Sequence, residues 1–135
     1  MAKTLNLQIV TPEGIAYSDD VESVGLRSVE GQIGILPNHI RLMTQMVPGE
    51  MTLRKDGQVK FLAVGQGLVE VTQDQVAILT DMAVAADTID EAKAEEARRR
   101  AEARLQEKIS AEELASVNAS LARSLAQLHV TRRHR

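Results

Sequence analysis

Apolar and polar residues alternate over the first two thirds of the chain, and this period of two predicts β-strands. The pattern begins at Leu5, Leu7 and Ile9. Turn residues interrupt each apolar run, and the clearest is Asp56-Gly57, a dipeptide typical of a type I′ hairpin turn. We count about eight to ten short strands, enough for two sheets packed face to face. The pattern favours a β-sandwich over an open sheet.

The composition changes abruptly near Ala85. Residues 88–128 contain no Gly and no Pro and are rich in Ala, Glu, Arg and Leu, all of which favour helix. The change divides the chain into a mainly β domain over residues 1–86 and a helical domain over residues 87–135. The fold class is therefore an N-terminal β-sandwich of about ten strands followed by two helices.

Two capping boxes mark where the helices begin. In each, a hydroxyl and a Glu three residues later satisfy free backbone N–H groups: Thr88 precedes Glu91, and Ser110 precedes Glu113. We predict helices over about residues 89–109 and 111–128. Apolar residues recur in each at spacings of three and four, namely Ala94, Ala97, Ala101, Leu105 and Ile109 in the first, and Leu114, Val117, Leu121, Leu125 and Leu128 in the second.

These two stripes are expected to face each other in an antiparallel hairpin. Alanine methyl groups bury little area compared with leucine at about 25 cal/mol per Å², so the contact is thin and the hairpin can come apart. On the other faces, Glu95 with Arg99 and Glu96 with Arg100 have the spacing of favourable ion pairs on one helix, each worth about 0.2–0.5 kcal/mol. We interpret them as a solvated, supporting face.

Composition narrows the class of protein. The 135 residues include no Cys, which excludes a disulfide framework and agrees with a reducing compartment; we take the cytoplasm as the default. The N-terminus lacks the apolar run of a signal peptide, and no stretch approaches the roughly 20 apolar residues of a membrane span. We therefore expect a soluble chain.

Charge is distributed unevenly. The net charge is −3, with one Tyr, one Phe and no Trp, which argues against a nucleic-acid stacking surface. Residues 1–87 carry six basic and eleven acidic side chains, residues 88–113 six and eight, and residues 114–135 four and none. The basic excess lies entirely at the C-terminal end.

No pattern for catalysis or metal binding emerges. His39, His129 and His134 match no zinc spacing, so we expect no metal site. Gly65 and Gly67 lie in a Gly-rich stretch, but no Lys-Ser or Lys-Thr follows as a phosphate loop requires. We interpret these glycines as permitting a bulge or a close sheet contact. An enzyme is the weaker class, and we expect no catalytic residue.

Four motifs in order resemble one known family, the epsilon subunits of the F-type ATP synthases, called delta in mitochondria. The resemblance covers nearly the whole chain. A glycine-rich segment ending in Leu-Pro-x-His is similar to the family's first signature, and a strand, Gly-rich bend, Val-Glu-Val and Leu-x-Asp to its second. The segments are "EGQIGILPNHIRL", "FLAVGQGLVEVTQDQVAILTDMA", "IDEAKAEEARRRAEARL" and "LARSLAQLHV".

The resemblance implies both a fold and a place in a complex. In the family a sandwich of about ten strands sits on the central stalk of the rotor, where it contacts the gamma subunit and the c-ring at the cytoplasmic face of the cell inner membrane. The complex makes ATP as H+ or Na+ flows through its membrane sector, whereas this subunit does no chemistry. Its helices extend along gamma toward the alpha and beta subunits and restrain ATP hydrolysis. No cofactor is required.

We interpret residues 31–42 as a docking loop for gamma and the c-ring. Its glycines adopt conformations barred to other residues and its proline fixes one dihedral, so less entropy is lost on binding. The family more often has Gly at Asn38 and Pro at Arg41. The contact residues are expected to be Gly31, Gln32, Pro37, His39 and Arg41. The alternative is that His39 is an ordinary loop residue.

The C-terminal arginines suggest a second contact. Arg123, Arg132, Arg133 and Arg135 have no acidic residue near them in sequence, and in the extended state of the family this helix lies beside an acidic segment of the beta subunit. Single exposed pairs contribute about 0–1 kcal/mol, so several must act together. The alternative is that the terminal "TRRHR" is a disordered basic tail.

Some family members bind ATP on the hairpin through Ile/Leu-Asp-x-x-Arg-Ala. This chain has Asp90 and, in place of the arginine, Lys93, which loses the bidentate guanidinium fork. ATP is thus a candidate regulatory ligand that binds weakly or not at all. A different class of protein also fits the pattern: a free-standing β-sandwich interaction module whose helices dimerise as a coiled coil.

Overall fold

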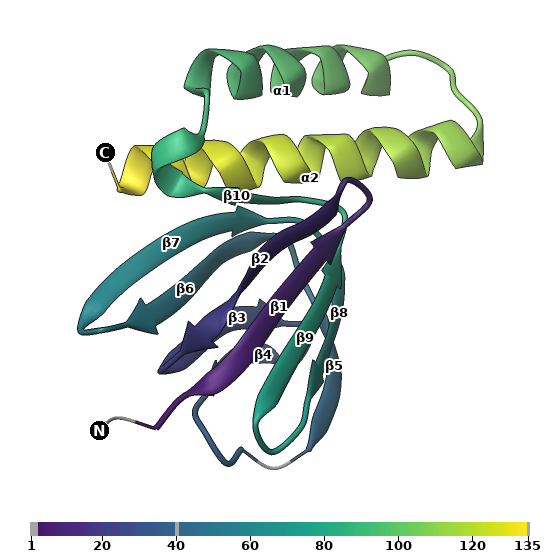
Figure 1. Cartoon of the computed structure of the whole chain (residues 1–135). Helices are drawn as coiled ribbons and strands as arrows, with labels where there is room; N and C mark the ends of the chain where they lie inside the picture. Colours follow the sequence, from purple (N-terminus) through teal and green to yellow (C-terminus); the bar gives the residue numbers. More distant parts are fainter. Residues whose placement is uncertain (1–2, 40, 135) are drawn as a thin grey trace.

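The computed structural model of the chain describes residues 3–39 and 41–134. Ten strands precede one short 3-10 turn and two α-helices (Figure 1). The strands are β1 (Leu5–Thr11), β2 (Gly14–Val21), β3 (Ser23–Ser28), β4 (Gly31–Ile35), β5 (Leu42–Met46), β6 (Gly49–Lys55), β7 (Gln58–Val64), β8 (Gly67–Val71), β9 (Gln75–Thr80) and β10 (Ala83–Ala85).

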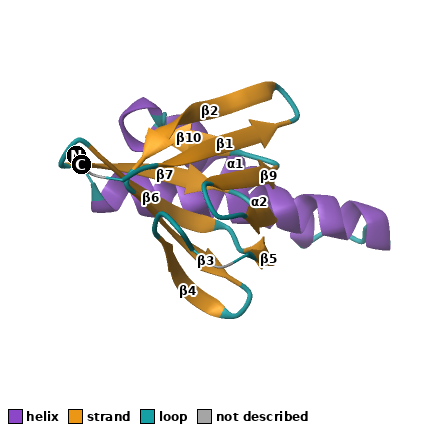
Figure 2. Ribbon diagram, turned by 60° about the horizontal axis from the view of Figure 1, so that its bottom comes forward, coloured by secondary structure: helices purple, strands orange, loops and turns teal. Residues whose placement is uncertain are grey.

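The strands form one continuous sheet that folds over on itself into two layers (Figure 2). Their order is β10-β7-β6-β3-β5-β8-β9-β1-β2, with β4 paired to β3. Neighbouring strands are antiparallel except β1 and β9, which are parallel. The layers join where β3 meets β5 through the single pair Ser28 and Met46. The predicted ten-stranded sandwich is confirmed, with its two sheets joined at one edge.

The Asp56-Gly57 turn forms as the sequence predicts. Asp56 has φ 51° and Gly57 has φ 75°, so both central residues are left-handed, as a type I′ turn requires. The flanking residues Lys55 and Gln58 pair directly, which fixes the register of β6 and β7 along their whole length.

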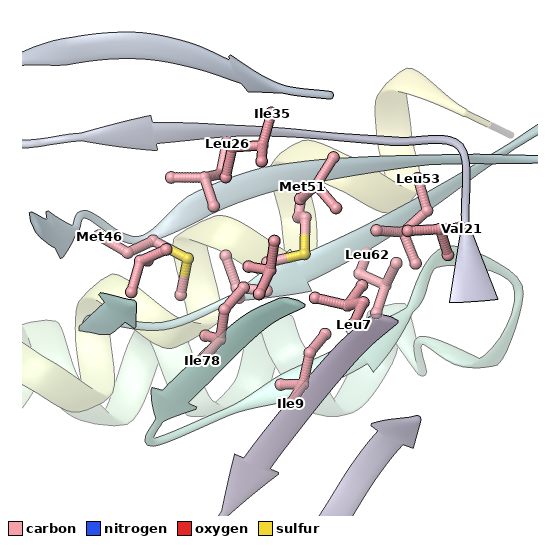
Figure 3. Close-up of a cluster of buried hydrophobic side chains, with 14 of the residues drawn as sticks. Leu7, Ile9, Val21, Leu26, Ile35, Met46, Met51, Leu53, Leu62 and Ile78 are labelled. Atoms are coloured by element: carbon pink, nitrogen blue, oxygen red, sulfur yellow. The ribbon is translucent and has the colours of Figure 1, made fainter. Parts of the chain in front are cut away.

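The core lies between the two layers, and inward-facing residues of nearly every strand fill it (Figure 3). Strand β1 shows the alternation clearly, because Leu5, Leu7 and Ile9 are buried while the residues between them are partly exposed. The largest side chains below 2 % exposure include Leu7, Ile9, Leu26, Ile35, Met51, Leu53 and Ile78. Branched and thioether side chains from strands far apart in sequence thus bind the two layers together.

Gly65 and Gly67 allow a close approach of chain segments, as the sequence suggests. A Cβ atom on Gly67 would overlap the carbonyl oxygen of Leu79, and one on Gly65 would overlap the carboxylate of Asp81. The turn after β9 therefore packs directly on the backbone of the Gly-rich bend.

The helices are α1 (Glu91–Leu105) and α2 (Ala111–Arg133), preceded by the 3-10 turn η1 (Ala86–Thr88). The expected N-cap Ser110 is confirmed, since its hydroxyl accepts a hydrogen bond from the backbone N–H of Glu113 at 3.1 Å. The other expected cap is wrong. Asp90 caps α1, and the Thr88 hydroxyl instead donates to the Ala85 carbonyl. Asp90 lies nearer the first helical turn and its carboxylate accepts more strongly than a hydroxyl.

Both helix ends differ from the sequence-based bounds. The first helix ends four residues earlier than the predicted residue 109, because the Ser110 cap requires extended backbone (φ −69°, ψ 163°) before the second begins. The second continues five residues beyond the predicted residue 128. Its added turn contains the fully buried Val130, so contact with the sandwich stabilises it.

Helix α2 lies between α1 and the sandwich (Figure 1). Ala126 and Val130 of α2 pack on Ala63 and Met82 of the sandwich. The antiparallel hairpin is confirmed, but the prediction that the two apolar stripes pack only against each other is wrong. Only Ala94 and Ala101 of the first stripe are buried, and Leu114 and Leu125 of the second are largely exposed. The reason is that α2 has two neighbours, so its apolar face is divided between them.

Candidate functional site

The loop between β4 and β5 lies at the end of the sandwich opposite the helices (Figure 1). The backbone N–H of Asn38 donates to the carbonyl of Gln73, in the β8–β9 turn, at 3.0 Å. The N–H of His39 donates to the carbonyl of Leu36 at 3.2 Å. Asn38 has φ 66°, a left-handed conformation that Gly and Asn tolerate best, so Asn fits where the family often has Gly. These bonds give the loop a defined shape.

The structure separates the predicted docking residues into two groups. Pro37, His39 and Arg41 lie together in this loop; Ile40 lies outside the described residues. Gly31 and Gln32 begin β4, about 20 Å of extended chain away from Pro37. The prediction of one loop over residues 31–42 is therefore wrong, because five of those residues pair with β3 as a strand.

The two glycines of this segment also differ. Gly31 has φ 121° and ends the tight β3–β4 turn, in which the Ser28 hydroxyl donates to its carbonyl at 2.8 Å. Gly34 does not use a positive φ, contrary to expectation, and faces open space. Gln32 lines a cleft of about 510 Å³ against α2, together with Arg27, Glu50 and Arg133.

An exposed apolar row crosses the outer face of the layer formed by β2, β1, β9, β8 and β5. Register places its members side by side: Ile15 pairs with Val10, Val10 with Leu79, and Leu79 with Leu68. Met43 lies diagonally beyond Leu68 on β5. Exposure is 64 % for Ile15, 56 % for Leu79, 51 % for Leu68 and 69 % for Met43. A contiguous surface of this kind marks a contact site.

Sequence reasoning missed this row, although a signal was present. A half-buried strand alternates apolar and polar residues, so two adjacent apolar residues place one side chain on each face. Such pairs occur at Ile9-Val10, Leu68-Val69 and Ile78-Leu79, and in each the inward member is buried. The outward members, Val10, Leu68 and Leu79, form the middle of the apolar row.

The C-terminal arginines that the structure describes have acidic partners, although no acidic residue is near them in sequence. Arg123 donates to Asp81, which precedes β10, at 2.9 Å. Arg132 contacts Glu91 at 2.9 Å and Glu95 at 3.3 Å, both on α1. Arg133 contacts Glu50 of β6 at 3.3 Å. The partners were missed because they are 37 to 83 residues away in sequence and only the fold brings them close.

The end of α2 is ordered through Arg133 and His134, so the alternative of a disordered tail is wrong for the described part of "TRRHR". Arg135 lies outside the described residues. His134 contacts the Glu50 carboxylate through Nε2, and its ring stacks on Phe61 with centroids 3.6 Å apart and an interplanar angle of 11°.

A network of ion pairs joins the two helices around Glu95. Arg98, on the same helix, donates to the Glu95 carboxylate and also reaches Glu102 at 2.6 Å. The bond from Arg98, assisted by Arg132, lowers the pKa of Glu95 to about 2 against the opposing effect of desolvation. The expected pairs of Glu95 with Arg99 at 3.4 Å and Glu96 with Arg100 at 2.8 Å are also formed.

The two residues singled out for ATP lie at the start of α1. Asp90 Oδ1 accepts the backbone N–H of Lys93 at 3.1 Å, so its carboxylate serves as the helix cap. The Lys93 side chain is exposed. Any phosphate contact from Lys93 would come from one flexible ammonium rather than a guanidinium fork.

Over residues 3–39 and 41–134, no three His, Asp or Glu side chains are grouped so as to hold a metal ion. In the same part of the chain, neither helix has the length and hydropathy needed to cross a membrane.

Comparison with known families identifies two consecutive matches that together span residues 4–132. Residues 4–86 match the family model described as "ATP synthase, Delta/Epsilon chain, beta-sandwich domain". Residues 87–132 match the model described as "ATP synthase, Delta/Epsilon chain, long alpha-helix domain".

Similar proteins in three bacteria are ATP synthase epsilon chains. The ATP synthase epsilon chain of Bacillus licheniformis is 40 % identical over 130 residues, 96 % of this chain and 99 % of its own length. That of Herpetosiphon aurantiacus is 40 % identical over 97 % of this chain and 96 % of its own. That of Bacillus subtilis is 46 % identical over 76 % of this chain and 78 % of its own.

Solved structures share the fold at lower identity. A chain of the Euglena gracilis mitochondrial ATP synthase, solved with OSCP, F1 and the c-ring, aligns with TM-score 0.71 at 23 % identity, covering 88 % of this chain and 76 % of that one. A chain of the Tetrahymena thermophila mitochondrial ATP synthase central stalk and c-ring aligns with TM-score 0.65 at 12 % identity, covering 98 % of each. At these identities the likeness concerns the fold.

Proposed function

Since this chain belongs to the ATP synthase delta/epsilon chain family, we propose that it is the epsilon subunit of an F-type ATP synthase. It is a central-stalk component of the rotor that couples ion flow through the c-ring to ATP synthesis. The observation that carries the proposal is the family match over nearly the whole chain at about 40 % identity to epsilon chains. Its partners are gamma, the c-ring and the alpha and beta subunits.

The chain has a non-catalytic role in this proposal. His129 lies on α2, His134 is the C-cap residue of that helix, and His39 lies in the loop at the far end of the sandwich. His134 is engaged with Glu50 and Phe61. The complex supplies the chemistry, and the subunit is held at the cytoplasmic face of the cell inner membrane through gamma and the c-ring. The dimerising-module alternative loses its basis, because α1 and α2 pair within one chain.

Two surfaces of the sandwich would make the rotor contacts. The loop of Pro37, His39 and Arg41 lies at the end away from the helices and faces the c-ring in this arrangement. The exposed apolar row fits gamma, because burying it removes contiguous apolar area from water. Gly31 and Gln32 belong to neither surface; Gln32 instead lines the cleft beside α2.

The docking proposal is tested by pull-down of this chain with recombinant gamma subunit. Leu68→Asp and Leu79→Asp are expected to weaken capture at least tenfold, since each places a charge in the apolar row. Val59→Asp is the matched control, because Val59 is a partly exposed apolar residue of β7 in the other layer. Capture by the row variants that equals capture by the control would exclude this face. His39→Ala with Arg41→Glu tests the loop in the same way against the c-ring.

The hairpin restrains ATP hydrolysis in its extended state, with Arg123, Arg132 and Arg133 near the beta subunit. Truncation after Val117 removes all three arginines and leaves the sandwich, so the assembled complex is expected to hydrolyse ATP faster. The measurement is ATPase activity of complexes matched for content of this subunit. Unchanged hydrolysis by a fully assembled truncated complex would contradict the restraint.

ATP is at most a regulatory ligand of the hairpin. Asp90 is committed to the helix cap and Lys93 offers a single ammonium, so Mg-ATP is expected to bind the isolated chain weakly or not measurably. Isothermal titration tests this. Lys93→Arg restores the guanidinium and is expected to raise the affinity, whereas Lys108→Arg at the far end of the hairpin serves as the control. Tight binding by the unaltered chain would contradict the inference.

A further inference from the structure

We propose that the last turn of α2 is a latch that holds the hairpin on the sandwich. The C-terminal latch comprises Glu50 and Phe61 of the sandwich, Arg133 of α2 and the C-cap residue of that helix, His134. It deepens the proposed regulation by naming the contact that sets how often the hairpin is released. The latch itself is a property of the isolated chain.

The latch is a compact set of contacts at one place. Glu50 receives Arg133 on one carboxylate oxygen and His134 on the other. The His134 ring lies almost parallel to Phe61 at 3.6 Å between centroids. The His134 backbone N–H donates to the Val130 carbonyl at 3.1 Å, so the backbone of His134 is fixed to the end of the helix. The side chain is therefore held by helix, carboxylate and aromatic ring together.

Among the described residues, Glu50 is the least exposed carboxylate that pairs with a C-terminal arginine. Its side chain is 15 % exposed, against 22 % for Glu95 and 24 % for both Glu91 and Asp81. A carboxylate withdrawn from water is costly to leave unpaired, whereas an exposed pair contributes little. When α2 leaves, Glu50 loses two partners, whereas Asp81 loses one. The last turn therefore contributes more charged contacts to docking than Arg123 does.

The rest of the docking surface is small, so the latch has a large relative effect. Four buried side chains form the centre of this apolar contact, Ala126 and Val130 of α2 with Ala63 and Met82 of the sandwich; the partly buried side chains packed against them are those of Phe61, Val84, Ala86 and Ile89. Two of the four buried side chains are single methyl groups, which bury little apolar area. One further ion pair, Arg123 with Asp81, lies almost three turns before the end of α2. The docked state thus rests on few contacts.

The latch also competes with the extended state. Arg123 and Arg133 cannot bind Asp81 and Glu50 while they serve another subunit, so extension must break both pairs. Arg132 is different, because its partners Glu91 and Glu95 lie on α1 within the hairpin. Any interaction that weakens the Glu50 contact shifts the population toward the extended hairpin.

The test measures hairpin release directly in the full-length chain. The sequence has no Cys, so cysteines replacing Glu30 of the β3–β4 turn and Ser116 of α2, both exposed, are the sole sites for spin labels. The docked chain gives one narrow distance between the labels, and release gives a broad second population. Urea raises the released population to a level that the distance measurement can detect. The urea concentration is kept below the one that alters the circular dichroism of the sandwich.

Glu50→Gln and His134→Ala are each expected to raise the released-to-docked ratio about tenfold, since the first removes the charge that both partners contact and the second removes one of the two contacts. The double variant should release no more than about twice as much as the stronger single variant, because both act on one contact. Glu70→Gln is the control: it makes the same charge change on an exposed residue of β8 and should leave the ratio within about twofold. Phe61→Leu separates ring stacking from apolar burial.

Unchanged distances in Glu50→Gln and His134→Ala, or fully additive effects in the double variant, would overturn the latch. If Glu50→Gln alters the sandwich itself, His134→Ala decides alone, because it lies at the end of the helix outside both core clusters. In the assembled complex, latch variants should lower ATP hydrolysis, the opposite of truncation. Released hairpins with unchanged hydrolysis would leave the latch standing and refute the proposed restraint.

Discussion

The sandwich and the hairpin hold together by different means. Leu, Ile, Val and Met side chains from strands distant in sequence fill the sandwich, and most are below 2 % exposure. The hairpin buries Ala94 and Ala101 of α1 and relies on ion pairs around Glu95 and Arg104. Salt screens exposed ion pairs but does not screen apolar burial. One chain thus combines a rigid sandwich with a hairpin that can open locally.

The strongest test of this comparison deletes one side chain from each region. Leu7→Ala is expected to lower the free energy of unfolding of the sandwich by about 3–5 kcal/mol, because Leu7 is fully buried and leaves a cavity. Ala101→Gly in the hairpin should cost about 1 kcal/mol, chiefly in helix propensity. Urea unfolding followed by circular dichroism measures both. Equal losses would remove the distinction between the two regions.

The second prediction concerns the close contact under the Gly-rich bend. Gly67→Ala is expected to cost about 1–3 kcal/mol, because its Cβ would overlap the Leu79 carbonyl oxygen. Gly34→Ala is the control, since that position has open space and no positive φ. It should be neutral or slightly stabilising in the same urea measurement. A costly Gly34→Ala would mean that β4 is constrained in some other way.

The third prediction separates docking from folding. Val130→Ala should weaken docking of α2 by about 1–2 kcal/mol, because Val130 is fully buried against the sandwich. Amide hydrogen exchange should quicken along α2 and stay slow in the β-strands. Leu125→Ala, on a largely exposed residue of the same helix, should change exchange little. Faster exchange throughout the sandwich would show that the two regions unfold together.

The smallest effect is expected from acid. The pKa of Glu95 is lowered from 4.5 to about 2, so its bonds stabilise the hairpin fully above about pH 4.5. That contribution is lost as the pH falls toward 2, because the carboxylate then takes up a proton. Helical circular dichroism should decrease over this window more in the unaltered chain than in Glu95→Gln. Glu96→Gln, which removes a mostly exposed carboxylate, should behave like the unaltered chain.

Local features were the ones that the sequence could predict. The alternation at Leu5, Leu7 and Ile9, the Asp56-Gly57 turn and the Ser110 cap all form as expected, because each depends on residues close together in the chain. The loop prediction held only for Pro37, His39 and Arg41, since pairing of β4 with β3 is a long-range choice. The apolar row was visible only as adjacent apolar pairs whose outward members need the register to be recognised.

The sequence by itself determined the secondary structure of the two regions. The first has alternating β-branched runs that form a sheet, and the second is a Gly- and Pro-free, alanine-rich segment that forms helices. Only the tertiary structure decided which charges meet. Asp81 pairs with Arg123, which is 42 residues away in sequence, and Glu50 pairs with Arg133, which is 83 residues away. Both pairs form only because the fold brings α2 against the sandwich. The physical reason is range: hydrogen-bonded turns and caps are local, whereas ion pairs between domains depend on where the whole fold places their side chains.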